Sequence, residues 1–451
     1  MLKIWYHDKL VGSIHINEDD RWEFEYEPDW NLFPIMPQLP IGKPIKKDVI
    51  HNRLIEWFMD NLLPEGNILD AYAASAGIHK DNTYGLLAEY GGDVAGALSI
   101  TPATAEKPSN EQHYQLLTHE VLLKKIKDSQ KGIPLMVADG RKRMSLAGAQ
   151  DKLTVKYQDG QLYLPEGYTP STHILKPNSV NSEYPYCPAN EYFCMQLADI
   201  VGLNVPATHL LSIDDERIYL VERYDRVVKD GQVKRLHQID GCQLLGLPKS
   251  KKYEDQGGVD FQTLMNDAAS TCEEQIKTKL DLLNWVIFNY LIGNSDAHAK
   301  NFSFLVTKEK VEPAKLYDLV CVEVYHKDNR LSSSIAGEMK AGLIEGAHWD
   351  AFSIMNNIKP ALTRSRVKVL SEKVKAAAYH LIDSEVFTHD EKLFLVNVIS
   401  VIDTRINFID EALKEPMRTR LIDFEDVNDG STRIDEHVLS MMGVSTGLRL
   451  S

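Results

Sequence analysis

The sequence predicts an α+β protein with two lobes, built from a β-rich N-terminal half and a helical C-terminal half. Three observations lead to this prediction. The chain has 451 residues, more than a single hydrophobic core usually organises. Along much of the first half, apolar residues alternate with polar ones, which is the period of a strand with one wet face. Beyond about residue 260, apolar residues recur at helical spacing.

The N-terminal segment, residues 1–110, is expected to form a β-containing subdomain. Aromatic residues alternate with glutamate over residues 22–26, as they do in a strand with one exposed face. A proline-rich stretch follows, and we expect it to be irregular. The expected elements are a strand at 22–26 and helices at 50–63 and 68–76.

Residues 111–255 are expected to form an N-lobe and residues 256–451 a helical C-lobe. Asp159-Gly160 and Asp230-Gly231 are dipeptides typical of two-residue hairpin turns. The elements expected in the N-lobe are strands at 152–157, 161–164, 173–176 and 217–224 and a helix at 189–201. Those expected in the C-lobe are helices at 275–292, 367–382 and 390–413.

The composition limits the function classes. The net charge is −15, which argues against strong nucleic-acid binding by the chain itself, because phosphate neutralisation needs clustered lysine and arginine. The basic runs Lys124–Lys127 and Arg141–Arg143 are local, and their simplest interpretation is a solvated face. Five cysteines without Cys-x-x-Cys spacing favour reduced thiols in a cytoplasm over a disulfide framework or a zinc site. No uncharged apolar run reaches the roughly 18 residues of a membrane span, so no membrane association is expected.

The most informative string is residues 293–303, which follows a long apolar helix. Within it, Asp296 and Asn301 are five residues apart, the separation between the catalytic aspartate and the metal-binding asparagine of protein kinases. Asp318 lies seventeen residues beyond Asn301, and its carboxylate suits hard Mg²⁺. The pattern predicts phosphoryl transfer, with Asp296 as the base and Asn301 and Asp318 as metal ligands.

Two other interpretations of this string remain open. Asp296 could cap a helix, or it could pair with His298 to bind a transition metal. Within the kinase interpretation, His298 is a hydrogen-bond donor to phosphate, because Asp296 already supplies the base. Lys300 could reach the transferred phosphoryl group as a point charge.

A kinase also needs a cation beside the nucleotide phosphates and a group that holds this cation. Lys176 ends an expected strand and is the candidate cation. Glu191 lies on the apolar face of the expected helix 189–201, where a carboxylate is costly unless it is paired. We therefore predict a Lys176–Glu191 ion pair. The alternatives are a surface lysine and an acid that serves the N-terminus of its helix.

Two further segments could contact a nucleotide. Small residues between a basic run and a strand would let backbone N–H groups approach phosphates, although an ordinary turn is the alternative. The residues of this candidate phosphate loop are Ala147, Gly148, Ala149, Gln150 and Lys152. Ser145 precedes them and follows Arg141–Arg143, which could stabilise a phosphoserine. The strand at 217–224 could supply an adenine hinge through the backbone of Glu222 to Tyr224.

The sequence resembles the HipA family of bacterial toxin kinases along most of its length. The resemblance rests on the order and the spacing of several short strings of residues. The resemblance implies a kinase-like two-lobe fold, distantly similar to that of phosphoinositide kinases, with an N-terminal β-containing subdomain and a helical C-lobe. Tyr224 stands where the family often has phenylalanine, and Ser295 where threonine is frequent, and neither change threatens the chemistry. The strings are Asp60-Asn61-Leu62-Leu63-Pro64, Gly96-Ala97-Leu98, Ser145 to Lys152, Leu175-Lys176-Pro177, Asn190-Glu191, Val221 to Arg226, Asn294 to Ser303 and Tyr317-Asp318.

The resemblance also implies a function. The chain would be a serine/threonine protein kinase that uses ATP and Mg²⁺, with Lys176 binding ATP and with Ser145 autophosphorylated to inactivate it. It would arrest growth, for example by phosphorylating an aminoacyl-tRNA synthetase, and a helix-turn-helix antitoxin bound to operator DNA would hold it. Two alternatives stay open, a lipid or small-molecule kinase and a catalytically inactive co-repressor. The intact set Asp296, Asn301 and Asp318 argues against the second.

Overall fold

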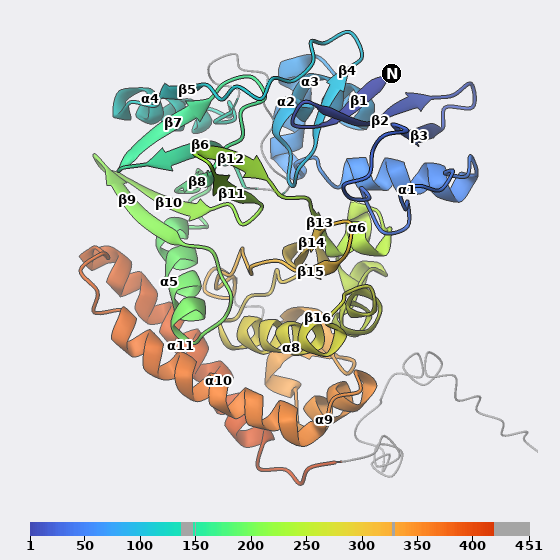
Figure 1. Ribbon diagram of the computed structural model, residues 1–451. Coiled ribbons are helices and arrows are strands. Elements are labelled where there is room, and N and C mark those ends of the chain that lie inside the picture. The colour runs from blue at the N-terminus through green and yellow to red at the C-terminus, as the bar shows by residue number, and fades with distance from the viewer. Residues whose placement is uncertain (137–147, 149, 327–329, 419–451) are drawn as a thin grey trace, which may run out of the picture.

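The computed structural model describes residues 1–136, 148, 150–326 and 330–418, which form an N-terminal subdomain and two lobes (Figure 1). The subdomain (blue) and the N-lobe (teal to green) lie side by side above the C-lobe (yellow to red). The predicted α+β class, with helices concentrated in the C-terminal half, is confirmed. None of the helices in the described ranges combines the length and the apolar character that crossing a bilayer would require.

The N-terminal subdomain contains a four-stranded antiparallel sheet in the order β3-β2-β1-β4. Trp22 and Phe24 are buried along β3, as their alternation with glutamate predicted. Helix α1 packs against β3 and begins at Asp48, whose side chain accepts a hydrogen bond from the N–H of His51. The elements are β1 (Leu2–Tyr6), β2 (Lys9–Ile16), β3 (Trp22–Tyr26), α1 (Val49–Asp60), α2 (Gly66–Ala76), α3 (Thr83–Tyr90) and β4 (Ser99–Pro102).

The N-lobe is built on a six-stranded sheet in the order β5-β7-β6-β8-β10-β9. At the two predicted hairpin turns, Asp159 and Gly160 have φ angles of 52° and 76°, and Asp230 and Gly231 have 54° and 74°. Positive φ at both central residues identifies type I′ turns, so both hairpins are confirmed. The elements are β5 (Tyr114–Leu116), α4 (His119–Ser129), β6 (Leu153–Gln158), β7 (Gln161–Pro165), β8 (His173–Pro177), α5 (Cys187–Ile200), β9 (Thr208–Ile213), β10 (Glu216–Glu222), β11 (Arg226–Lys229) and β12 (Gln232–Arg235).

In the C-lobe, the long helices α10 and α11 lie on the outer side and α8 lies inside them (Figure 1). A three-stranded sheet, β13-β14-β15, crosses the boundary predicted near residue 255, because β13 pairs with β14. The elements are β13 (Gln238–Asp240), α6 (Gly241–Leu245), α7 (Phe261–Thr263), α8 (Gln275–Leu291), β14 (Ser303–Val306), β15 (Val311–Pro313), β16 (Arg330–Ile335), β17 (Glu338–Lys340), α9 (Gly346–Met355), α10 (Pro360–Leu381) and α11 (His389–Ala412).

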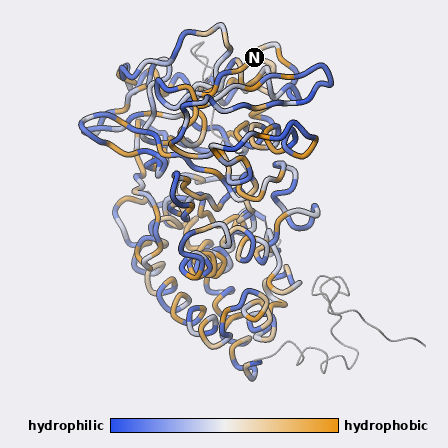
Figure 2. Tube along the Cα trace, turned by 45° about the vertical axis from the view of Figure 1, so that its right-hand side comes forward, coloured by the Kyte–Doolittle hydropathy of each residue, from blue (hydrophilic) through white to orange (hydrophobic). Residues whose placement is uncertain are grey.

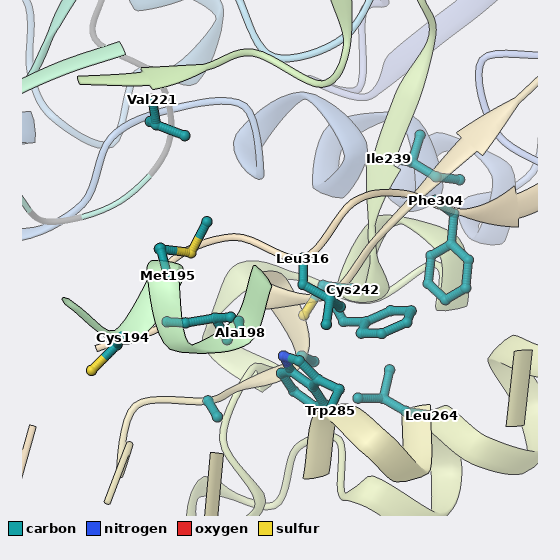
Figure 3. Packing of buried hydrophobic residues seen from close by; sticks show 14 of the residues in the cluster. Cys194, Met195, Ala198, Val221, Ile239, Cys242, Leu264, Trp285, Phe304 and Leu316 are labelled. Atoms are coloured by element: carbon teal, nitrogen blue, oxygen red, sulfur yellow. The ribbon is translucent and has the colours of Figure 1, made fainter. Parts of the chain in front are cut away.

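One cluster of buried hydrophobic residues extends through both lobes. Figure 3 shows a part of it where α5, α6, α8, β13 and β14 meet, with Met195, Cys242 and Trp285 among its members. The hairpins that project at the sides of the molecule are mainly hydrophilic (Figure 2). Because burying a large apolar side chain stabilises the fold by about 1.5–3 kcal/mol, this shared core stabilises the packing of the two lobes against each other.

A buried ion network joins the N-terminal subdomain to the N-lobe. Asp93 lies 3.0 Å from both Arg226 and Arg235, and Asp225 lies 2.8 Å from Arg223 and 2.9 Å from Arg226. All five side chains are buried. Since a buried charge is costly without a partner, these pairs fix the subdomain against the start of β11.

One predicted surface feature is different in the structure. The run Lys124–Lys127 lies on α4, a helix that was not expected from the sequence. Lys125 is buried, and its Nζ donates a hydrogen bond to the Leu135 carbonyl oxygen at 3.1 Å. The run is therefore not a fully solvated basic face. The other run, Arg141–Arg143, lies outside the described residues.

Candidate active site

A cleft of about 360 Å³ lies between the N-lobe sheet and the loops of the C-lobe. Its volume falls in the range of small-molecule sites, roughly 300–1,000 Å³. Every predicted site residue in the described ranges lines this cleft, whereas Ser145, Ala147 and Ala149 lie outside those ranges. The lining residues that were predicted are Gly148, Gln150, Lys152, Lys176, Glu191, Glu222, Tyr224, Asp296, His298, Lys300, Asn301 and Asp318.

The end of α8 turns the chain into the loop that carries Asp296. The N–H of Gly293 donates to the Tyr290 carbonyl, and the N–H of Asn294 donates to the Asn289 carbonyl, which are the two bonds of a Schellman motif. Gly293 has a φ of 67°, a conformation that glycine adopts without steric cost. The Asn294 side chain then accepts a hydrogen bond from the N–H of Asp296 at 3.1 Å. Local hydrogen bonds therefore shape the start of this loop.

The Asp296 side chain opens onto the cleft and is 48% exposed. Its Oδ1 accepts a hydrogen bond of 2.5 Å from the Tyr253 hydroxyl group. Desolvation by the surrounding chain raises the pKa of Asp296 to about 6, a shift that Tyr253 opposes and Asp318 reinforces. A carboxyl group with this pKa suits a general base near neutral pH. The contact with Tyr253, in place of backbone amides, does not support the helix-cap interpretation.

Asn301 and His298 flank this carboxylate. Nδ2 of Asn301 donates to the Asp296 backbone oxygen at 2.8 Å, and its Oδ1 has no protein partner within the described ranges. Nε2 of His298 lies 4.0 Å from Oδ1 of Asp296, which is too long for a hydrogen bond. Burial lowers the pKa of His298 to about 3, with Lys252 adding to the effect, so the imidazole is neutral. Its Nδ1 is buried without a hydrogen-bond partner in the part of the chain that the structure describes.

Asp318 and Lys176 form a second group across the cleft. Nζ of Lys176 lies 2.8 Å from Oε1 of Glu191 and 3.0 Å from Oδ1 of Asp318, so the predicted Lys176–Glu191 ion pair is present. Burial alone would raise the pKa of Asp318, but Lys176 and Lys152 hold it at about 2. Asp318 has a φ of 56°, a conformation that non-glycine residues rarely adopt and that is common at functional sites.

The described part of the predicted phosphate loop lies at the cleft. Gly148 has a φ of 118°, and a Cβ added there would lie 2.8 Å from Nζ of Lys152. The N–H of Glu65 donates to the Gly148 carbonyl at 3.1 Å, which ties the loop to the N-terminal subdomain. Burial and the nearby Lys176 lower the pKa of Lys152 to about 8. Lys152 and Lys176 thus place two cationic side chains at the cleft, with the carboxylates of Glu191 and Asp318 beside them.

The strand β10 ends at the predicted hinge. The N–H of Glu222 donates to the Ala207 carbonyl, so this group is already used. The N–H of Tyr224 has no acceptor among the described residues. The Tyr224 ring stacks on Tyr317, with centroids 5.3 Å apart and planes at 29°. Among the N–H groups of the predicted hinge, that of Tyr224 is therefore the candidate donor to an adenine ring.

Lys300 has a different environment from the one predicted. Its Nζ donates to the backbone oxygen of Asn61 at 2.9 Å and to Oδ1 of Asn61 at 3.0 Å. Glu65 and Asp240 lie 3.5 Å and 3.6 Å away. These contacts anchor the Asp296 loop to the N-terminal subdomain, and they favour a positioning role over contact with a transferred group.

Sequence reasoning missed the contribution of residues 249–258, which lie between α6 and α7. Tyr253 binds Asp296, and Lys252 lies 2.6 Å from Glu65. No motif marks this segment, because its function depends on partners that are distant along the chain. Asn61 belongs to a string that was noted for its family resemblance, but its hydrogen bonds to Lys300 could not be predicted.

The site has the groups that phosphoryl transfer needs. Asp296 is a candidate base, and oxygen atoms of Asn301 and Asp318 are the ligand types that Mg²⁺ prefers. Within the described ranges, no three His, Cys, Asp or Glu side chains form a metal cage, which does not support the transition-metal interpretation. The oxygen atoms of Asn301 and Asp318 would leave the remaining positions around such a Mg²⁺ ion to a nucleotide and to water.

Two protein-family models match the chain. A HipA N-terminal domain model matches residues 2–101, and a HipA-like C-terminal domain model matches residues 144–381. Both matches fall on described structure for most of their length, the first on the N-terminal subdomain and the second on both lobes.

Individual proteins are similar over most of the chain. The serine/threonine-protein kinase toxin HipA of Shewanella oneidensis is 33% identical over 362 residues, which cover 76% of this chain and 81% of that protein. Y4mE of Sinorhizobium fredii is 31% identical over 393 residues, covering 85% of this chain and 92% of that one. The solved complex of HipA, HipB and operator DNA from S. oneidensis MR-1 contains a chain that matches with a TM-score of 0.80 and 30% identity. That match covers 92% of this chain and 100% of the other.

Proposed function

Because this chain belongs to the HipA family of serine/threonine protein kinase toxins, we propose that it transfers the γ-phosphoryl group of ATP, bound with Mg²⁺, to a protein hydroxyl group. The observation that carries the proposal is the meeting of Asp296, Asn301 and Asp318 in one cleft. Lys176 lies beside them, held by Glu191 at 2.8 Å.

Each of these residues has a role that follows from its surroundings. Asp296 accepts the proton of the attacking hydroxyl group. Asn301 and Asp318 would hold Mg²⁺ through their side-chain oxygen atoms, and the ion would supply positive charge beside the nucleotide phosphates. Lys176 and Lys152 bind the phosphates. His298 is neutral and can donate only one ring hydrogen, so it orients a phosphate oxygen or water without adding charge.

We expect the purified chain to transfer ³²P-phosphate from γ-³²P-ATP to serine residues of protein when Mg²⁺ is present. This activity should be lost when EDTA removes the metal. Phosphoamino-acid analysis identifies the acceptor, and peptide mass spectrometry locates it. We expect Ser145 to be one labelled residue, since Arg141–Arg143 precede it and can pair with a phosphate. The new charge of about −1.5 to −2 would compete with nucleotide phosphates for Lys152 and Lys176 and inactivate the kinase.

Two results would contradict this proposal at different points. Label that appears only in lipid or small molecules would favour the alternative kinase class. Phosphate on Ser145 of the Asp296→Asn variant, expressed alone, would show that another kinase adds it.

We also propose that a helix-turn-helix antitoxin neutralises the chain and carries it to operator DNA. The S. oneidensis complex, in which HipA was solved together with HipB and operator DNA, supports this proposal by similarity. The net charge of −15 opposes tight DNA binding by the kinase alone. We expect fluorescence polarisation at two salt concentrations to detect operator binding only when the antitoxin is present. Nanomolar binding by the isolated chain near physiological salt would contradict this expectation.

A further inference from the structure

The segment 249–258 contacts the proposed base through one side chain. The hydroxyl group of Tyr253 donates to Oδ1 of Asp296 at 2.5 Å, and the Tyr253 ring packs edge-on against His298 with centroids 5.0 Å apart. Within residues 1–136, 148, 150–326 and 330–418, no other group donates a hydrogen bond to this carboxylate. Tyr253 therefore decides which way the Asp296 carboxylate faces.

The chain on both sides of Tyr253 is fixed to other parts of the molecule. Before it, Lys252 lies 2.6 Å from Glu65 of the N-terminal subdomain. After it, Glu254 accepts hydrogen bonds from the hydroxyl groups of Ser333 and Ser334, at 2.7 Å and 2.8 Å, and from the Ser334 N–H at 2.6 Å. Both serines lie on β16. The residues before and after Tyr253 are therefore both held, which restricts the position from which its side chain reaches Asp296.

An aspartate at a cleft can rotate about two side-chain bonds, and only some orientations aim an oxygen at an incoming hydroxyl group. With Oδ1 anchored on Tyr253, Oδ2 remains for that hydroxyl group, and the 48% exposure of the side chain leaves it room. Fixing a reacting group in advance lowers the barrier, because the ordering is done before the substrate arrives. We propose that Tyr253 is a positioning residue that orients Asp296 for proton transfer, and that Glu254 holds Tyr253 in place for this role.

This inference rests on the proposed function, and kinetics can test the two separately. The probe is Mg·ATP, and the rate is that of γ-phosphate loss, whichever acceptor takes it. Tyr253→Phe keeps the ring and removes the hydroxyl group. A hydrogen bond to a charged group corresponds to about 10- to 100-fold in rate, so we expect kcat to fall by about that factor. KM for ATP should change by less than about twofold, because the phosphate-binding residues remain.

Glu254→Gln provides a second variant, since it weakens the contacts to Ser333 and Ser334 without touching Asp296. We expect it to lower kcat as well, and the double variant Tyr253→Phe/Glu254→Gln to fall little below Tyr253→Phe alone, because both act through one contact. Asp255→Asn is the matched control. It removes one carboxylate from an exposed neighbour on the same segment and should keep wild-type kcat.

The outcomes separate the possibilities. Wild-type kcat in Tyr253→Phe, or a rise in KM for ATP with kcat unchanged, would overturn the positioning role. A rise in kcat would also overturn it, since Tyr253 would then be blocking the acceptor hydroxyl group. If the wild-type chain shows no turnover of Mg·ATP, the proposed function itself fails and the inference fails with it. Tyr253→Phe could melt at a lower temperature than wild type. In that case a lower kcat in Glu254→Gln, with a double variant that falls little below Tyr253→Phe, supports positioning, and wild-type kcat in Glu254→Gln overturns it.

Discussion

The Asp296→Asn variant is expected to lose about 10²- to 10⁴-fold in phosphoryl-transfer rate, the range typical of a general base. Asparagine keeps the shape of the side chain, and its oxygen can still accept the hydrogen bond from Tyr253. Its amide group cannot take up the proton of a hydroxyl group. KM for ATP should stay close to the wild-type value, because Lys176, Lys152 and Asp318 are unchanged.

The same carboxyl group sets the expected pH dependence of the wild-type rate. Since the pKa of Asp296 is raised to about 6, the group is protonated below that pH and cannot act as a base. We therefore expect kcat/KM, which reflects the free enzyme, to fall about tenfold per pH unit below about pH 6 and to level off above it. Steady-state assays from acidic to neutral pH check this, and the residual rate of Asp296→Asn should lack the acidic decline. Near-wild-type turnover in that variant would remove Asp296 from the mechanism.

The Asp318→Asn variant is expected to lower the rate by about 10²- to 10³-fold, the scale on which one charge-stabilising group acts. The substitution removes a carboxylate that the structure keeps ionised, with its pKa at about 2. It leaves Lys176 paired with Glu191, so the fold around the cleft keeps its buried ion pair. Asp318→Asn should therefore weaken Mg²⁺ binding more than it lowers the stability of the fold.

A titration of Mg²⁺ at fixed ATP concentration distinguishes metal binding from other effects. Asp318→Asn should need more Mg²⁺ than wild type for half its maximal rate, whereas Asp296→Asn should need the same. Asp199→Asn on α5 is the control, because Asp199 is exposed and the charge change is identical. An unchanged Mg²⁺ requirement in Asp318→Asn would show that this carboxylate is not a ligand.

Much of the fold could be predicted because short-range patterns determine it. Helix α8 was expected at 275–292 and spans Gln275–Leu291. Helix α4 was missed, although Thr118 at its N-cap and Glu120 in its first turn are recognisable start signals. The lysines of 124–127 suggested a solvated run and obscured the apolar positions between them. Charge alone is therefore a poor guide to burial when a long lysine side chain can reach a buried carbonyl.

Local sequence patterns indicated several of the groups that meet in the cleft. Asp296 and Asn301 share one short loop, and Glu191 on an apolar helix face required a cation, which is Lys176. How these groups are held depends on the packing of distant segments. Tyr253 lies 43 residues from Asp296, and Asn61 lies 239 residues from Lys300. Periodicity and turn chemistry depend on residues a few positions apart in the sequence. The contacts of Tyr253 and Asn61 depend instead on how the subdomain and the lobes pack, so no local pattern predicts them.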